Sequence, residues 1–488
     1  MKLYKDKYEP VIGLEVHAQM KTHSKAFCRC STEFSAPANS NICPVCLGHP
    51  GTLPVLNHDL VTFILKMGLA LNCKIRERSM FARKNYFYPD LSKGYQITQF
   101  DTPICYDGFL NINLKDGEAK RIDITRIHME EDAGKSIHDF SDDDSLIDFN
   151  RCGVPLIEIV SEPDIRSTEE AVAYLQKIRQ LLVYLDINDG NMEEGSLRCD
   201  ANISIREYGT QKFGTRTEIK NLNSFRNVSD ALEAEITRQI EVIESGQKVF
   251  YNTMTFDSVH KKTSSTRTKE EAHDYRYFPE PDLVYVEVTE KWLSEIKSGL
   301  PEFPEAKKER FKKEYKLSDY DADILIQSKE LSKYYEDVVN SLEAKNENSF
   351  KTVSNWVQTE ILRILNENKL ELHDLKLKPA NLSELINYLN RKEINNNTAK
   401  EVLAEMYETG KSASEIIKEK NLIQVSDDGF INDIIKKILS ENSSEVSRYK
   451  AGEKKLIGVF VGKIMKESKG KANPQKVNEL LIKNLEEA

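Results

Sequence analysis

The chain has 488 residues and a formal net charge of −10 at pH 7. Its length exceeds what one hydrophobic core holds, so we expect about three domains. The acidic balance argues against a protein that coats nucleic acid over its whole surface, but it does not exclude local basic patches. No apolar run approaches the roughly 18 residues of a membrane span. Residues 1–7 carry no sign of a secretory signal, and we therefore expect a cytoplasmic protein outside membranes.

Residues 11–20 alternate between apolar and polar side chains, which predicts a strand with one buried face. The polar face carries Glu15 and His17. A carboxylate and an imidazole two residues apart on a rigid strand form half of a metal site or an acid/base site. An edge strand with a solvated polar face is the alternative, and for this pattern alone it is the commoner case.

Four of the eight cysteines are clustered, as the pairs Cys28 and Cys30, then Cys43 and Cys46. Two closely spaced thiol pairs across a short loop are typical of a tetrahedral zinc site. Four sulfur ligands leave no open coordination position, so this zinc would be structural. The alternative is four independent thiols, and the Cys-x-Cys spacing is tighter than in most zinc knuckles.

Acidic residues recur in three later segments that we expect to be strands. A β-branched run ends in three consecutive acids, residues 130–132, which fit either a solvated strand end or a set of metal ligands. Glu158 stands alone among apolar neighbours, where a buried carboxylate must be paired, protonated or metal-bound. In residues 197–205, Arg198 and Asp200 share the polar face of a strand.

Mostly antiparallel strands that curve around a pocket would bring these acids together. Several carboxylates at one site repel one another unless a divalent cation lies between them, so the pattern predicts Mg²⁺ or a similar hard cation. Adjacent arginine and lysine would then suit a phosphorylated substrate. On spacing alone, a metal-assisted phosphate enzyme and unrelated polar strand faces remain equally open.

Residues 81–96 alternate aromatic side chains with cations, including Lys84 and Lys93. Such a loop could hold phosphate or stack a base, and an ordinary aromatic-anchored surface loop is the alternative. Near residue 289 the β-branched alternation gives way to helical periodicity rich in lysine and glutamate. Residues 448–471 are locally basic, which suggests an RNA contact. A solvated lysine-rich helix face is the alternative there.

Seven motifs in this sequence together resemble one known family. They are residues 13–17, 83–90, 128–135, 155–164, 194–202, 274–279 and 465–474. In this order they are similar to the GatB family, which is the B subunit of the aspartyl/glutamyl-tRNA amidotransferases. The similarity runs from about residue 8 to the end of the chain.

The resemblance implies an α+β fold with three parts. The first is a cradle domain built on an antiparallel sheet, residues 1–290, which holds a zinc-binding loop at 28–46. An all-α helical domain follows at 291–405. A small helical tail that resembles the YqeY proteins and binds tRNA takes residues 406–488.

The resemblance also implies the activity of a ligase, an ATP-dependent carbon–nitrogen ligase with glutamine as amido donor. The family works as a heterotrimer with a glutaminase (amidase), which is the A subunit, and with a small C subunit. ATP phosphorylates the side-chain carboxylate of mischarged Glu-tRNA(Gln), Asp-tRNA(Asn) or both. Ammonia that is channelled from the glutaminase then displaces phosphate and gives the amide.

The resemblance assigns roles to individual residues. The magnesium ligands it implies are Glu15, His17, Glu131 and Glu158, with Asp200 in support. Arg198 would face phosphate and complete the catalytic set, and Lys84 and Lys93 would line the region where ammonia arrives. Structural zinc would lie on Cys28, Cys30, Cys43 and Cys46.

Two other classes of protein fit the same residues. A metal-dependent phosphohydrolase or nuclease could use the same acids. A zinc-containing RNA-binding scaffold without enzymatic activity would also account for the cysteines and the basic tail.

Overall fold

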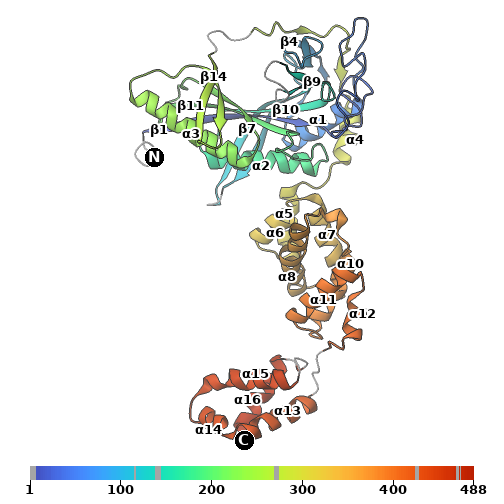
Figure 1. Ribbon diagram of the computed structural model, residues 1–488, viewed down its shortest axis with the longest axis vertical. Coiled ribbons are helices and arrows are strands. Elements are labelled where there is room, and N and C mark those ends of the chain that lie inside the picture. The colour runs from blue at the N-terminus through green and yellow to red at the C-terminus, as the bar shows by residue number, and fades with distance from the viewer. Residues whose placement is uncertain are drawn as a thin grey trace. The chain divides into compact units, whose positions relative to one another are not determined.

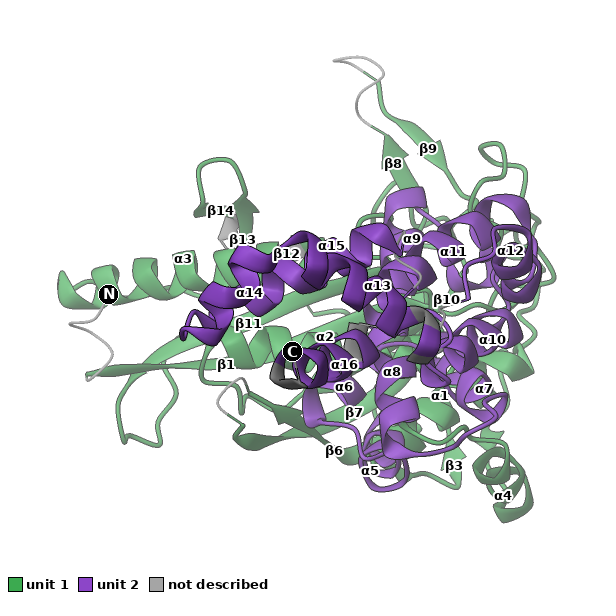
Figure 2. Cartoon of the chain, turned by 90° about the horizontal axis from the view of Figure 1, so that it is seen from below, with its two compact units in different colours: residues 1–303 green, residues 304–488 purple. Residues whose placement is uncertain are grey.

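The computed structural model describes residues 7–114, 117–137, 144–268, 274–423, 428–468, 472 and 474–487. The chain divides into two compact units, Met1–Phe303 and Pro304–Ala488 (Figure 2). The first unit combines a large sheet with helices and the second is helical, which confirms the predicted α+β class. Across the described residues, no helix is long and apolar enough to cross a membrane.

A nine-stranded sheet forms the centre of the first unit, in the order β14-β13-β12-β11-β1-β10-β7-β6-β2. Its strands are β1 (Tyr8–Gln19), β2 (Lys74–Ile75), β6 (Cys105–Asn113), β7 (Ala119–Glu131), β10 (Pro155–Ser161), β11 (Leu197–Glu207), β12 (Thr217–Leu222), β13 (Asn252–Asp257) and β14 (Lys262–Thr268). Neighbouring strands are antiparallel except β12 and β13, which are parallel. The mostly antiparallel sheet predicted from the acidic strands is therefore present.

Three small sheets accompany the large one. The first has the order β15 (Phe278–Pro279), β4 (Ala82–Asn85) and β5 (Tyr95–Thr98). The other two pair β16 (Val286–Glu287) with β3 (Arg78–Ser79), and β8 (Lys135–Ile137) with β9 (Leu146–Asp148).

Strand β1 lies between β10 and β11, and its alternation divides the sheet into two chemically different faces. On the apolar face, Ile12, Leu14 and Val16 are fully buried. This face packs against α1 (His58–Ala70), α2 (Thr168–Tyr184) and α3 (Phe225–Glu244), which lie along one side of the sheet in Figure 1. Because the helices take up the apolar face, the polar side chains of β1 point to the other face.

The first unit ends with α4 (Glu290–Ser298), which packs onto the core of the sheet domain through Ile296. The resemblance implies a helical domain from 291, and in the structure the apolar stripe of α4 packs against the core of the sheet domain.

The second unit contains only helices among its described residues. They are α5 (Pro304–Tyr315), α6 (Asp319–Leu325), α7 (Lys329–Asn340), α8 (Glu347–Trp356), a π-helix (Val357–Ile361), α9 (Leu362–Asn368), a 3₁₀ turn (Leu372–Asp374), α10 (Pro379–Asn390), α11 (Asn396–Thr409), α12 (Ala413–Glu419), α13 (Asp428–Glu441), α14 (Ser443–Lys450), a 3₁₀ turn (Lys454–Leu456), α15 (Ile457–Glu467) and α16 (Pro474–Glu487). They form two separate hydrophobic cores, one from Phe311 to Ile417 and one from Ile431 to Leu485. The resemblance implies a boundary at 405, and the first core continues through α12 to Ile417.

Candidate functional site

The strand register places three titratable side chains in a row on the polar face. His17 of β1 lies opposite Glu158 of β10, and Glu158 lies opposite His128 of β7. His17 Nε2 is 3.2 Å from Glu158 Oε2, and His128 Nε2 is 3.3 Å from the same oxygen. Glu158 therefore lies between two imidazoles. Burial opposes its ionisation, but the charges and hydrogen bonds of His128 and His17 outweigh burial and hold its pKa well below the usual value.

Glu130 completes a group that could hold a metal ion. Its Oε1 lies 3.7 Å from His17 Nε2, and ligand atoms of His17, Glu130 and Glu158 all lie within 4.8 Å of one another. Burial and the neighbouring Glu158 raise the pKa of Glu130. Two buried carboxylates that repel each other beside an imidazole form a donor set that a divalent cation would stabilise.

His17 responds to the same charges in the opposite direction. Burial alone would lower its pKa, but the carboxylates of Glu158 and Glu130 outweigh burial and raise the pKa to about 9. The carboxylates around His17 therefore favour positive charge at this position.

Glu131 points to the opposite face of the sheet from Glu130, because successive strand residues alternate. Its carboxylate forms an ion pair with Lys93 and accepts a hydrogen bond of 2.9 Å from the Ile97 backbone N–H. The Gln96 side chain donates to the Glu131 carbonyl at 2.7 Å. The register therefore places Glu130 beside His17 and Glu158, whereas Glu131, which the resemblance implies as a magnesium ligand, pairs with Lys93.

Glu15 and Asp200 face each other across β1 and β11 and border the cluster. Asn202 Nδ2 donates to Glu15 at 2.7 Å, and Lys220 Nζ lies 3.2 Å from Asp200. Burial, with the charge of Glu158, raises the pKa of Glu15. Both acids share the face of His17 but lie outside the three-residue group.

Cations surround these acids. Arg198 donates to Asp132 at 2.7 Å, and its Nε is buried without a hydrogen-bond partner among the described residues. Lys84 Nζ lies 5.0 Å from the centre of the Tyr275 ring. Burial would lower the pKa of Lys84, but Glu130 in particular raises it, so the ammonium stays charged. A polar face of mixed charge, with an unsatisfied guanidinium nitrogen, suits a phosphorylated ligand.

The structure brings the four predicted zinc ligands together. Sulfur atoms of Cys28, Cys30, Cys43 and Cys46 lie within 4.8 Å of one another, which is compatible with a structural metal site. A hydrogen bond from Cys28 lowers the pKa of Cys46 to about 4. Fully buried Lys25 donates to the Asn41 carbonyl at 2.7 Å, and its Nζ lies 3.7 Å from Cys46 Sγ.

Sequence reasoning missed His128 and Lys220 as members of this face, and it considered Glu130 and Asp132 only as part of the acidic triplet at 130–132. The alternation of β7 contained a signal for His128 and Glu130. In a strand, His128 and Glu130 point to one face and Glu131 points to the other, so the face that carries His128 also carries Glu130 but not Glu131.

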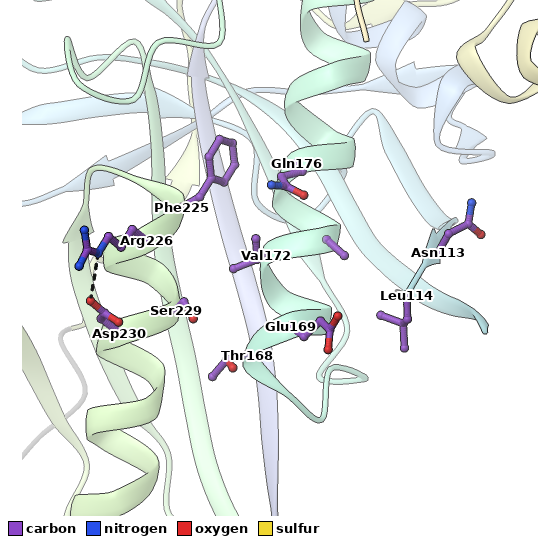
Figure 3. A pocket seen from close by; sticks show the side chains of 11 residues that line it. Asn113, Leu114, Thr168, Glu169, Val172, Gln176, Phe225, Arg226, Ser229 and Asp230 are labelled. Carbon is purple, nitrogen blue, oxygen red and sulfur yellow. Dashed lines mark ion pairs between the residues drawn. The ribbon is translucent and has the colours of Figure 1, made fainter. Parts of the chain in front are cut away.

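A cavity of about 560 Å³ lies among the helices, apart from the acid cluster (Figure 3). Val172 and Gln176 of α2 and Phe225 of α3 line it, and an ion pair joins Arg226 to Asp230 there at 3.7 Å. It is built on the helices that cover the apolar face, so the acid cluster takes no part in it.

Comparison with known proteins gives matches along nearly the whole chain. Residues 10–294 match the family described as "GatB/GatE catalytic domain", and residues 333–485 match the family described as "GatB domain". A protein of Thermodesulfovibrio yellowstonii, named as the B subunit of an aspartyl/glutamyl-tRNA(Asn/Gln) amidotransferase, is 57% identical over 480 residues, which cover 98% of this chain and 100% of that protein. Proteins of the same name from Geotalea daltonii and Geobacter sp. are 53% and 52% identical, over 98% of this chain and 99% and 100% of theirs.

Proposed function

This chain belongs to the GatB family, and from that premise we propose that it is the component of a tRNA-dependent amidotransferase that activates and amidates an amino acid on its tRNA. The substrates are Glu-tRNA(Gln), Asp-tRNA(Asn) or both, as the names of its relatives indicate. Whole-length similarity of this kind favours the amidotransferase over a phosphohydrolase or an RNA-binding scaffold.

The chemistry requires ATP. A carboxylate does not react with ammonia until one of its oxygens becomes a good leaving group. Transfer of the γ-phosphoryl group of ATP to the side-chain carboxylate gives an acyl phosphate and ADP. Ammonia then forms the C–N bond of the amide, and the C–O bond to phosphate breaks.

The observation that carries the proposal is the group of His17, Glu130 and Glu158 on the polar face of the central strands. These three residues would hold Mg²⁺, with Glu15 and Asp200 beside them. Bound there, the cation would neutralise phosphate charge during phosphoryl transfer. Glu131, which the sequence suggested as a ligand, would act instead by fixing Lys93 at the end of β7.

The positively charged side chains of the site would bind the phosphate groups and line the region where ammonia arrives. Arg198, held by Asp132, would offer its unpaired Nε to a phosphate oxygen. Lys84 would face the reacting phosphate and the arriving ammonia, because Glu130 and Glu158 keep it charged beside them. Lys93 would line the same region through its ion pair with Glu131.

Partner subunits, a structural zinc and the helical tail complete the proposed function. The chain would act in the cytoplasm with a glutaminase as the A subunit and with a small C subunit, and zinc on the four cysteines would fix the loop at 28–46 structurally. The tail would hold tRNA through its cations. Those within the described residues are Arg448, Lys450, Lys454, Lys455, Lys463 and Lys466, whereas Lys469 and Lys471 and part of the motif at 465–474 lie outside them.

Co-expression with the two partner proteins tests the proposal. The purified complex should amidate mischarged tRNA only when ATP and glutamine are both present, and trials with Glu-tRNA(Gln) and Asp-tRNA(Asn) would identify the substrate. Turnover of ATP or RNA by this chain alone, with no amide formed by the complex, would favour the phosphohydrolase instead.

A further inference from the structure

Lys25 carries a charged side chain that is fully buried, although it lies outside the acid cluster. It precedes the first pair of clustered cysteines, and its backbone N–H donates to the Cys30 carbonyl at 3.0 Å. An ammonium group loses its hydration when it is buried, so lysine is almost never fully buried unless it is paired. The groups around Lys25 Nζ therefore show what compensates its charge.

The ammonium of Lys25 has three N–H donors and three acceptors around it. It donates to the Asn41 carbonyl at 2.7 Å and to the Phe149 carbonyl at 3.3 Å, and Cys46 Sγ lies 3.7 Å from Nζ. Carbonyl oxygens accept hydrogen bonds but carry no net charge. Of the three acceptors, only the cysteine sulfur can become an anion.

Carboxylates do not take this place. Within the part of the chain that the structure describes, no carboxylate forms an ion pair with Lys25. Glu131 is close, since a Cβ at Gly153 would lie 3.5 Å from Lys25 Cδ and 3.8 Å from Glu131 Oε2. The Glu131 carboxylate, however, is paired with Lys93. The charge of Lys25 is therefore directed at the four-cysteine group.

Cys46 is placed to act as an anionic ligand. Its side chain is buried, and its Sγ accepts a hydrogen bond from the Cys43 backbone N–H at 3.1 Å as well as facing the ammonium of Lys25. Metal binding requires thiolates, and a divalent cation held by four of them leaves two negative charges uncompensated. Such an excess is costly in a buried site, and Lys25 would remove half of it.

We propose that Lys25 is a positioning residue of the four-cysteine site, where its buried ammonium balances part of the negative charge of a divalent metal ion held by four thiolates. The inference rests on the zinc site of the proposed function and concerns how this chain holds the ion. The alternative is that Lys25 only joins the loop to Asn41 and Phe149 through hydrogen bonds.

Three substitutions of Lys25 separate its charge from its hydrogen bonds. Lys25→Gln keeps a donor without the charge, Lys25→Arg keeps the charge, and Lys25→Met keeps the apolar stem but removes both charge and donor. Lys21→Met, at an exposed lysine of the same segment, is the matched control, because a solvated charge contributes little.

The measurements are the Kd of the whole chain for Zn²⁺, by competition with a chromophoric chelator, and the Tm with and without Zn²⁺. We expect Lys25→Gln and Lys25→Met to raise the Kd roughly tenfold to a hundredfold, as loss of a residue that supports a metal ligand commonly does. Lys25→Arg should recover part of the affinity, and Lys21→Met should keep the wild-type Kd. Because tighter binding to the folded chain stabilises it more, added Zn²⁺ should raise the Tm less in Lys25→Gln than in the wild type.

The results distinguish the charge from a purely structural role. Wild-type Kd values for Lys25→Gln and Lys25→Met would overturn the inference, and so would equal losses in Lys25→Gln and Lys25→Arg, because the charge would then not matter. If Lys25→Met does not fold, the comparison of Lys25→Gln with Lys25→Arg decides. A wild-type chain that binds no Zn²⁺ would refute the zinc site and the inference with it. None of these measurements needs amide formation, so they decide about Lys25 even if the complex shows no amidotransferase activity.

Discussion

His17 of β1 and Glu158 of β10 face each other across the middle of the large sheet, with 3.2 Å between Nε2 and Oε2. The two residues are far apart in sequence, and the pairing of their strands brings them together. Their register thus builds the central pair of the candidate site. Every prediction about the cluster depends on this register, because a shift by one residue would turn one of the two side chains into the core.

The register distinguishes Glu130 from Glu131, and matched substitutions should separate their roles. We expect Glu130→Gln to weaken Mg²⁺ binding by roughly tenfold to a hundredfold or more, since even changes to residues that only support a ligand cost that much. Glu131→Gln should leave Mg²⁺ binding near wild type. It should lower the free energy of unfolding by about 3 kcal/mol, because Lys93 would remain buried without its partner.

Titration calorimetry with Mg²⁺ and denaturant unfolding measure these two effects. Loss of Mg²⁺ binding in Glu131→Gln alone, with Glu130→Gln unchanged, would restore Glu131 as the ligand and contradict the placement of the cluster.

Glu235 of α3 should make stability depend on pH. Its side chain is fully buried and accepts hydrogen bonds from Arg238, Thr263 and Gln239 at 2.6, 2.7 and 2.9 Å. Burial opposes ionisation, but these bonds, that of Arg238 first, lower its pKa below the usual value. A lowered pKa in the folded state adds stability above the unfolded value near 4.3, and this stability is lost as pH falls through the folded pKa.

Denaturant unfolding between pH 7 and pH 3 checks this contribution. The Glu235→Gln variant should lose less stability over that interval than the wild-type chain. Parallel pH profiles for the two proteins would show that Glu235 does not contribute.

The four-cysteine site should hold about one zinc ion per chain, because it offers four thiolate ligands to a tetrahedral cation. Cys28→Ser should reduce the zinc content measured by elemental analysis and lower Tm. Cys73→Ser, at a cysteine outside the group, is the control and should keep the zinc. A zinc-free wild-type protein that is insensitive to chelators would refute the structural metal.

The tail should contribute to tRNA binding as a separable part. Its core begins at Ile431, whereas the preceding core ends at Ile417, so truncation after Ile423 should leave the preceding helices folded. We expect the Kd for tRNA to rise at least about tenfold, with a weaker dependence on salt, because several phosphate contacts are lost. An unchanged Kd, measured by filter binding at two salt concentrations, would remove the tail from the tRNA site.

Alternation in the sequence correctly predicted the faces of β1 and β11, because a strand with one buried face needs apolar residues at every second position. It also placed Glu15, His17, Glu158 and Asp200 on one surface. Alternation along β7 groups Glu130 with His128 and apart from Glu131, but which of these two faces meets Glu158 depends on pairing with β10, which no local pattern encodes.

Tertiary packing also decided the position of α4. The spacing of Trp292 and Ile296 predicted its helix, but nothing in that spacing says which core the stripe covers. The four-cysteine group was predictable for the opposite reason, because two short-range cysteine pairs nearly define a tetrahedral site on their own.

Amide formation by the complex carrying Glu158→Gln tests the central claim most directly. Glutamine nearly matches glutamate in shape but cannot supply the charge that the cluster needs, and ammonium chloride can replace glutamine so that the channel is not required. The account predicts that the wild-type complex amidates mischarged tRNA with ATP, and that Glu158→Gln loses roughly a hundredfold or more of this activity while glutamine hydrolysis by the partner glutaminase continues. Amidation by Glu158→Gln at the wild-type rate would contradict it.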